Sequence, residues 1–171
     1  NGVGLVADSL PRYLAALAIG DRFGAKAEAA TFDRLRIALM RMGDVAAQVQ
    51  LALATPADPS YAGLIVTKGP LVFRLVERAA GRDAMLAAIR AALAAARTSG
   101  ALTLDDLEAA IQKSSGRDLG PLYAAWFDTV TQPDLIIGVP QQTGGVWTSA
   151  LRNLGSGDVT VDVVATASHH V

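Results

Sequence analysis

Residues 103–128 constrain the fold of this chain more than any other stretch, because they carry start and stop signals for two successive helices. Thr103 can cap the first helix, and Asp106 stands three residues later, where the partner of a capping box belongs. Apolar residues then follow at the spacing of one helical face, at Leu104, Leu107 and Ile111. Beyond Gly116 there is a second apolar stripe, formed by Leu119, Leu122, Tyr123 and Trp126. The stretch therefore predicts a helical hairpin.

The remainder of the first 130 residues predicts further helices. Apolar residues recur at helical spacing in segments at about residues 10–20, 26–42, 45–53, 61–80 and 86–98. Gly69-Pro70 should kink or restart the helix at 61–80, because proline has no backbone N–H to donate. Hydrophobic residues make up 51% of the chain, and many of them are alanine, the best helix former. We therefore expect a mainly α fold, a helical bundle.

A small antiparallel β unit is expected after the helices. Residues 131–134 include Pro133 and are typical of a linker. Residues 135–137 form an apolar run that predicts a strand. Further along, three valines alternate with polar residues, at Val159, Val161 and Val163, which is the period of a half-buried strand. The sequence thus predicts a helical domain over residues 1–130 and a β unit over residues 135–171.

Charge and composition exclude several classes of partner. The net charge is −1 and no basic stripe is visible, so we expect no nucleic acid partner. The chain has no cysteine, so it forms neither disulfides nor thiolate metal sites. The most apolar run, residues 84–96, is mostly alanine and contains Arg90, so we expect no membrane segment in this chain. Residues 1–4 lack the pattern of a signal peptide, and cytoplasmic and periplasmic locations both stay open.

Three segments, in this order, resemble the M1 family of zinc aminopeptidases (gluzincins). Residues 5–13 are similar to the segment where the family's third zinc ligand, a glutamate, starts a helix. Residues 61–75 are similar to the family's Y-x-K-G helix, through Lys68-Gly69 and the aliphatic run after them. Residues 115–119, S-G-x-D-L, and the helix carrying Trp126 are similar to the end of the catalytic domain. The resemblance implies the C-terminal half of a gluzincin catalytic domain, joined to the start of a β-sandwich.

The resemblance also implies candidate site residues. Asp8 stands at the position of the glutamate ligand, although its side chain is one methylene shorter, and the alternative is a helix-start residue favoured by the helix dipole. Val66 occupies the position of the family's catalytic tyrosine and cannot donate a hydrogen bond to an oxyanion. Tyr61, five residues upstream, could replace it, or could simply cap an amphipathic face. Lys68 has no acidic residue at i+4, so we expect a solvated side chain.

The family's H-E-x-x-H motif, which supplies two histidine ligands and a general base, is absent from this chain. The only histidines are His169 and His170, which are adjacent and are typical of a tail. We therefore expect no zinc and no peptide hydrolysis in this chain, although a full-length parent with an upstream H-E-x-x-H could be an aminopeptidase acting on peptides. The expectation is a fragment or a degenerate member of the family. The alternative is a non-enzymatic helical module for protein interaction.

The resemblance has a consequence for association. If part of the catalytic domain is missing, helix faces that line the family's zinc cleft should lack their packing partner. These faces carry two apolar stripes, Leu10, Leu14 and Leu17 on one helix and Leu64, Ile65 and Val66 on another. A large exposed apolar patch is unusual for a soluble monomer. We therefore expect these stripes to bind the missing N-terminal part or to drive self-association.

Overall fold

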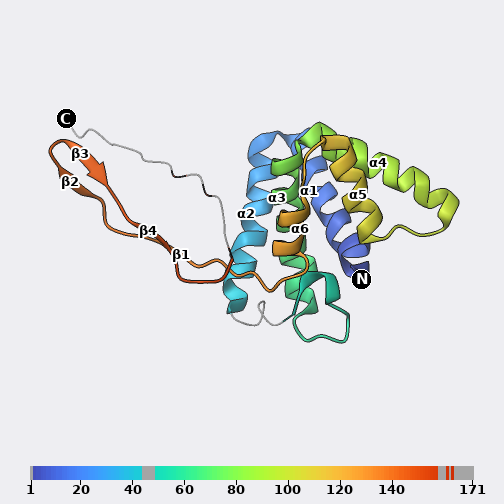
Figure 1. Cartoon of the computed structure of the whole chain (residues 1–171), viewed down its shortest axis with the longest axis horizontal. Helices are drawn as coiled ribbons and strands as arrows, with labels where there is room; N and C mark the ends of the chain where they lie inside the picture. Colours follow the sequence, from blue (N-terminus) through green and yellow to red (C-terminus); the bar gives the residue numbers. More distant parts are fainter. Residues whose placement is uncertain (1, 44–48, 158–160, 162, 164–171) are drawn as a thin grey trace. The chain divides into compact units, whose positions relative to one another are not determined.

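A computed structural model describes residues 2–43, 49–157, 161 and 163 of the chain. The chain divides into two compact units, Asn1–Val130 and Thr131–Val171 (Figure 1). The first unit is helical and the second contains short antiparallel strands, so the predicted mainly α fold with a small β unit is confirmed. None of the described helices combines the length and the apolar character needed to cross a membrane.

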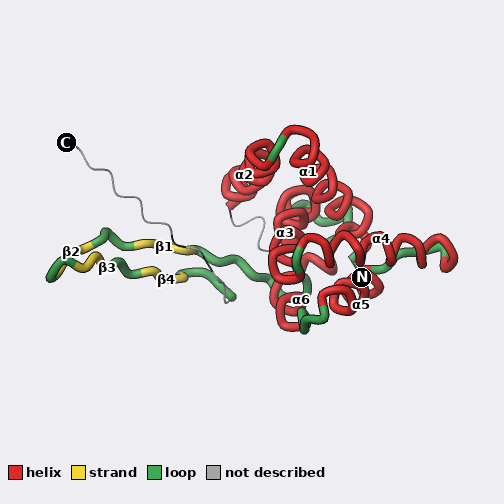
Figure 2. The backbone as a smooth tube through the Cα atoms, turned by 90° about the horizontal axis from the view of Figure 1, so that it is seen from above, coloured by secondary structure: helices red, strands yellow, loops and turns green. Residues whose placement is uncertain are grey.

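The helical unit contains α-helices joined by shorter helical turns. The elements are η1 (Leu5–Ser9), α1 (Leu10–Phe23), α2 (Ala25–Met42), η3 (Leu51–Leu53), η4 (Ala62–Lys68), α3 (Gly69–Ala80), α4 (Arg82–Ser99), α5 (Leu104–Ser115) and α6 (Gly120–Trp126). Helix α3 lies in the middle, with the α1–α2 pair on one side and the α4–α5 pair on the other (Figure 2). Its residues Val72, Phe73 and Val76 are almost fully buried and form the centre of the core.

The two helices predicted in residues 103–128 are present as α5 and α6, but α5 packs mainly against α4 and does not form a hairpin with α6. The Thr103 hydroxyl accepts a hydrogen bond from the backbone N–H of Asp106 at 3.1 Å, and the Asp106 carboxylate accepts one from the backbone N–H of Thr103 at 3.1 Å. These reciprocal bonds satisfy backbone donors that a helix start leaves open. Gly116 ends α5 with a φ of 64°, in the left-handed region that glycine adopts without strain.

The helix over residues 61–80, expected to kink or restart at Gly69-Pro70, divides into two elements at Gly69. Residues Ala62–Lys68 form the π-helix η4, and Gly69–Ala80 form the α-helix α3, with Pro70 in the first turn of α3. Proline is tolerated there, because the first N–H groups of an α-helix have no intrahelical partner. The helix predicted over residues 45–53 lies partly outside the described residues, and its described end is the single 3-10 turn η3.

The apolar stripes expected to be exposed are in fact part of the core, so that expectation is wrong. Leu64 and Ile65 have no exposed surface, Leu10 and Leu17 are 3% and 4% exposed, and Leu14 and Val66 are half-buried. The reason is that α1 packs against α3, and η1 packs against η4, within the same unit. The helices close their own core, and the stripes give no drive for self-association.

The β unit contains two antiparallel ladders of two strands each. Strand β1 (Leu135–Ile137) pairs with β4 (Leu151–Asn153), and β2 (Gln141–Thr143) pairs with β3 (Val146–Thr148), both antiparallel. Gly144 and Gly145 connect β2 to β3 with φ values of 58° and 81°, as a type I′ turn requires. The strand predicted at residues 135–137 is therefore confirmed.

Residues 131–134 are not a free linker. The backbone N–H of Leu154 donates to the carbonyl of Asp134 at 2.7 Å, and that of Ser156 donates to the carbonyl of Gln132 at 2.9 Å. These bonds extend the pairing of β1 with β4 towards residue 131. The strand predicted around Val159 lies largely outside the described residues, and Val161 and Val163 are not in a strand.

Candidate functional site

Asp8 and Tyr61, the two candidate site residues, lie together. The Tyr61 hydroxyl donates a hydrogen bond to Oδ2 of Asp8 at 2.8 Å, although 53 residues separate them in the chain. Asp8 is carried by η1, and Tyr61 is the residue directly before η4. Both side chains are half-buried. The structure therefore brings into one place the two residues that the sequence could assign only through separate segments.

The two elements that carry this pair are both π-helical, which is uncommon. A π-turn contains an extra residue, and such turns occur frequently at functional sites. At the end of η1, the Ser9 hydroxyl donates to the backbone carbonyl of Ile65 in η4 at 2.5 Å. This bond is buried and joins the two elements directly. The irregular backbone is thus stabilised by contacts across the η1–η4 interface.

Two glycines allow the close approach of these elements. A Cβ atom at Gly4 would lie 2.7 Å from the Tyr61 hydroxyl oxygen, so a larger residue there would displace the tyrosine. A Cβ atom at Gly69 would collide with the Ser9 hydroxyl and lie 2.7 Å from its Cβ atom. Gly69 belongs to the Lys68-Gly69 pair on which the family resemblance partly rests. The close contact with Ser9 explains why a residue larger than glycine does not fit at this position.

The hydrogen bond sets the chemistry of the pair. The pKa of Tyr61 is raised, chiefly because its hydroxyl donates to the Asp8 carboxylate, with partial burial and the carboxylate charge adding to the effect. A tyrosine in this state stays protonated at neutral pH and remains a hydrogen-bond donor. To donate to an oxyanion, as the resemblance implies, it would have to leave Asp8. In this arrangement the pair connects η1 to the start of η4, and the one hydroxyl proton of Tyr61 is already donated to Asp8.

The residues around Asp8 do not fit a zinc ion. A catalytic zinc site needs three protein ligands. No group of three or more His, Cys, Asp or Glu side chains that could hold a metal occurs in residues 2–43 and 49–157. His169 and His170 lie outside the described residues. Val66, at the position of the family's tyrosine, is half-buried and offers no polar atom.

Lys68 differs from its expected solvated state. Its side chain is buried, with a relative exposure of 6%, and its Nζ atom lies 6.0 Å from the ring centroid of Trp126. Burial lowers its pKa, because the charged form is the one that loses hydration. A cation held against an indole ring is attracted by the ring's negative face. Lys68 therefore links η4 to α6 and is not a surface lysine.

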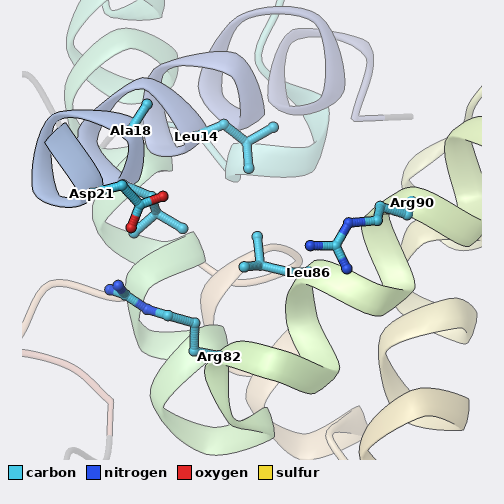
Figure 3. Close-up of a pocket in the computed structure, with 7 residues that line it drawn as sticks. Leu14, Ala18, Asp21, Arg82, Leu86 and Arg90 are labelled. Atoms are coloured by element: carbon cyan, nitrogen blue, oxygen red, sulfur yellow. The ribbon is translucent and has the colours of Figure 1, made fainter.

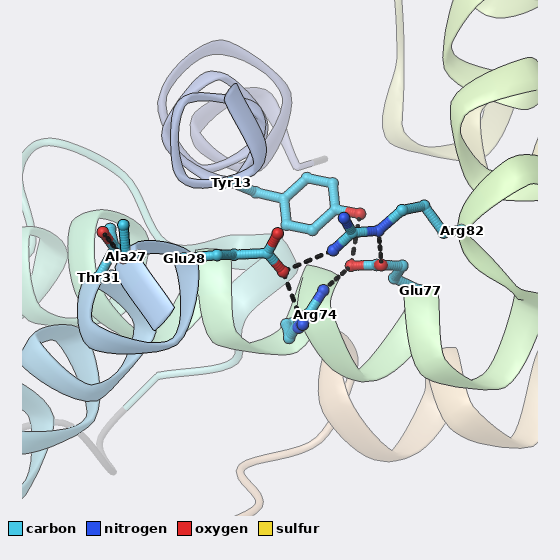
Figure 4. Close-up of polar contacts among 7 residues, drawn as sticks. All are labelled: Tyr13, Ala27, Glu28, Thr31, Arg74, Glu77 and Arg82. Atoms are coloured by element: carbon cyan, nitrogen blue, oxygen red, sulfur yellow. Dashed lines mark hydrogen bonds and ion pairs between the residues drawn. The ribbon is translucent and has the colours of Figure 1, made fainter. Parts of the chain in front are cut away.

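A second polar cluster, which sequence reasoning missed, joins α1, α2, α3 and α4 (Figure 4). Glu28 and Glu77 are nearly buried, at 4% and 5% exposure. Arg74 contacts Glu77 at 2.6 Å and Glu28 at 2.7 Å, and Arg82 contacts the same two carboxylates at 2.6 Å and 2.5 Å. We call these four residues the ion-pair quartet. The Tyr13 hydroxyl also donates to Glu77, at 2.9 Å.

The quartet is electrically balanced, and each of its two buried carboxylates is paired with both arginines. Burial raises the pKa of Glu77, but the hydrogen bonds from Arg82, Arg74 and Tyr13 together outweigh burial, and its pKa is lowered overall. Across the described part of the chain, no buried side-chain nitrogen or oxygen lacks a hydrogen-bond partner. A cluster whose buried carboxylates are both paired stabilises helix packing. We therefore assign it a structural role.

One carboxyl outside both clusters has a raised pKa. Burial raises the pKa of Glu108 on α5 to about 7, with the charges of Asp128 and Asp105 adding to the effect. Like charges near a partly desolvated carboxyl disfavour its ionised form. Nothing in its surroundings resembles a binding site, and an acidic cluster alone does not indicate one.

No protein-family model, curated protein or solved structure matches this chain. The resemblance to M1 peptidases therefore rests on the three segments of the sequence. The Asp8–Tyr61 hydrogen bond brings the position of the family's glutamate together with the residue that could replace the family's tyrosine, whose own position holds Val66.

Proposed function

We propose that this chain is the C-terminal part of a catalytic domain of the M1-peptidase type, either a fragment or a degenerate member, and that it does not hydrolyse peptides by itself. The hydrogen bond between Tyr61 and Asp8 is the observation that carries the proposal. Asp8, at the position of the family's glutamate, contacts Tyr61, which lies five residues before the family's tyrosine position and could replace that tyrosine.

Among the residues that the structure describes, no further metal ligands lie beside Asp8, and for this reason we expect the chain alone to be inactive. A single carboxylate neither holds zinc in a fixed geometry nor lowers the pKa of a bound water. Tyr61 is engaged by Asp8, and the family's tyrosine position holds Val66. In this state the η1–η4 region is a scaffold, and any peptidase activity belongs to a longer parent protein.

One observation favours the alternative, a non-enzymatic interaction module. The apolar stripes that would line a zinc cleft are buried within the chain's own helical unit. A helical unit that closes its own core needs no further half of a catalytic domain to be stable. The peptidase proposal expects an H-E-x-x-H helix to be encoded before residue 1, whereas the interaction-module proposal expects an unrelated fold there.

The gene sequence that precedes Asn1 tests the proposal. We expect it to encode an H-E-x-x-H helix, and a protein lengthened to include that helix should hold close to one equivalent of zinc. Residues 1–171 alone should hold well under one equivalent by elemental analysis after dialysis. Asp8→Ala should lower the zinc content of the lengthened protein, whereas Asp21→Ala, on the exposed end of α1, should leave it unchanged.

Other outcomes of this test are informative. The family's fold with altered zinc-binding residues upstream would identify a degenerate member. An unrelated fold there, or a zinc content that does not depend on Asp8, would contradict the peptidase proposal and favour the interaction module.

A further inference from the structure

A pocket of about 220 Å³ lies between α1 and the first half of α4 (Figure 3). It does not include Asp8 or Tyr61. Its apolar lining comes from both helices, namely Leu14, Leu17, Ala18 and Leu86. Its polar lining is Asp21 on α1 and Arg82 and Arg90 on α4. Apolar walls with a few placed polar groups are the usual features of a small-molecule site.

Arg90 is free to bind a ligand. It is exposed and has no hydrogen-bond or ion-pair partner among the residues that the structure describes. Its guanidinium group points towards the Leu86 side chain, over the apolar part of the pocket (Figure 3). An arginine binds a carboxylate through paired N–H donors, and here it would give up no existing contact to do so.

Arg82 lines the other side of the pocket, across Leu86 from Arg90 (Figure 3). Its Nε and Nη2 atoms bind Glu77 and Glu28, and its Nη1 atom takes no part in those bonds. Arg82 also begins α4, where the helix dipole favours a negative charge.

The charges limit how strongly an anion can bind. The ion-pair quartet is neutral, so the charge of Arg82 is already offset by Glu28 and Glu77. Arg90 is the uncompensated positive charge at the pocket. Asp21 lies across Leu86 from Arg90 (Figure 3), and its negative charge disfavours the binding of an anion. The expected ligand is therefore a single carboxylate with an apolar body, bound weakly, and not a multiply charged anion.

We propose that this pocket binds small apolar carboxylic acids. The carboxylate accepts hydrogen bonds from Arg90, and the apolar chain lies on Leu14, Leu17 and Leu86. The proposal does not depend on the proposed function, because it uses no residue of the Asp8–Tyr61 pair.

Titration of the isotope-labelled protein with octanoate, followed by amide NMR shifts, tests this site. We expect saturable shifts at residues of α1 and α4 that line the pocket. Arg90→Gln should weaken binding roughly tenfold, because a charge-assisted hydrogen bond is lost. Asp21→Asn should strengthen it by about threefold, because a nearby like charge is removed. The matched control is Arg97→Gln, an exposed arginine on the same helix outside the pocket, which should bind octanoate as the wild type does.

Two further ligands test the contributions of the carboxylate and of the apolar chain separately. Octanol lacks the carboxylate and acetate lacks the apolar chain, so each should bind more weakly than octanoate at the same residues. The proposal is overturned if octanoate gives no saturable shifts at the pocket. Equal affinity in the Arg90→Gln and Arg97→Gln variants, or equal binding of octanol and octanoate, would overturn it too.

Discussion

Replacing Glu77 by alanine should lower the free energy of unfolding by about 3–5 kcal/mol, the range for removing one member of a buried ion pair. Glu77 is 5% exposed and accepts hydrogen bonds from Arg74, Arg82 and Tyr13. Without it, two guanidinium groups are left facing the single carboxylate of Glu28, and the Tyr13 hydroxyl is buried without an acceptor. The loss thus combines unpaired charge with an unsatisfied polar group.

Chemical denaturation of the wild type and the variant measures this effect. The matched control is Asp33→Ala, which removes a carboxylate from the exposed Asp33–Arg36 pair on α2. The side chains of that pair are 54% and 66% exposed, so the control should cost less than about 1 kcal/mol. Similar losses in the two variants would show that the quartet is not a buried, cooperative cluster.

The same variant has an expected pH dependence. Because the folded-state pKa of Glu77 is lowered, its stabilising contribution is present above the unfolded pKa, near 4.5, and is lost as the pH falls through the folded value. The difference in stability between the wild type and Glu77→Ala should therefore shrink as the pH falls below about 4.5. A difference that stayed constant over this range would contradict the assignment.

Gly69→Ala should lower the free energy of unfolding by about 2–3 kcal/mol, despite the higher helix propensity of alanine. The added Cβ atom would lie 2.7 Å from Cβ of Ser9, which sits close to the backbone and cannot move alone. Relief requires η1 and α3 to separate, and the buried bond from the Ser9 hydroxyl to the Ile65 carbonyl would weaken as they do. Overpacking and a lost hydrogen bond therefore outweigh the gain in propensity.

Gly63→Ala is the matched control for this substitution. Gly63 lies in η4, six residues earlier, and an added Cβ atom there would meet the Cε and Sδ atoms of Met42. That end of a methionine side chain is flexible and can rotate away. Gly63→Ala should therefore be close to neutral in thermal or chemical unfolding. Equal destabilisation by the two substitutions would show that the close approach of Ser9 to Gly69 does not decide the packing.

The parts of the fold that depend on local signals could be predicted. The Thr103–Asp106 capping box and the Gly116 stop are local, so the α5 boundaries follow from the sequence. The strand at residues 135–137 follows in the same way from a short apolar run. Such features depend on hydrogen bonds between residues that are close in the chain.

Features that depend on distant contacts could not be predicted in this way. The quartet joins Glu28 to Arg82 across 54 residues, and no spacing in the sequence marks that contact. The π-helical form of η1 and η4 has no sequence signal of its own, because it follows from how the two elements pack. The stripes at Leu10 and Leu64 were correctly recognised as apolar, but periodicity does not reveal which face covers them.

The residues of the candidate site could be predicted from the sequence, but the contacts between them could not. Asp8 and Tyr61 were selected through a resemblance to a family and not from a pattern of residues alone. Their hydrogen bond could not be predicted, because the separation of the two helices depends on the small size of Gly4 and Gly69. The buried state of Lys68 was missed for a similar reason, since Trp126 comes from a distant helix.

The pKa of Tyr61 tests the Asp8–Tyr61 pairing, which carries the proposed function, most directly. Carbon NMR of labelled tyrosine resolves the three tyrosines of the chain, and Tyr61→Phe assigns the signal. Tyr61 should titrate above the ordinary value near 10, because Asp8 accepts its hydrogen bond. In Asp8→Ala its pKa should fall towards that value, whereas the control Asp21→Ala should leave it raised. An unchanged Tyr61 pKa in Asp8→Ala would contradict the pairing and, with it, the main support for a peptidase-like site.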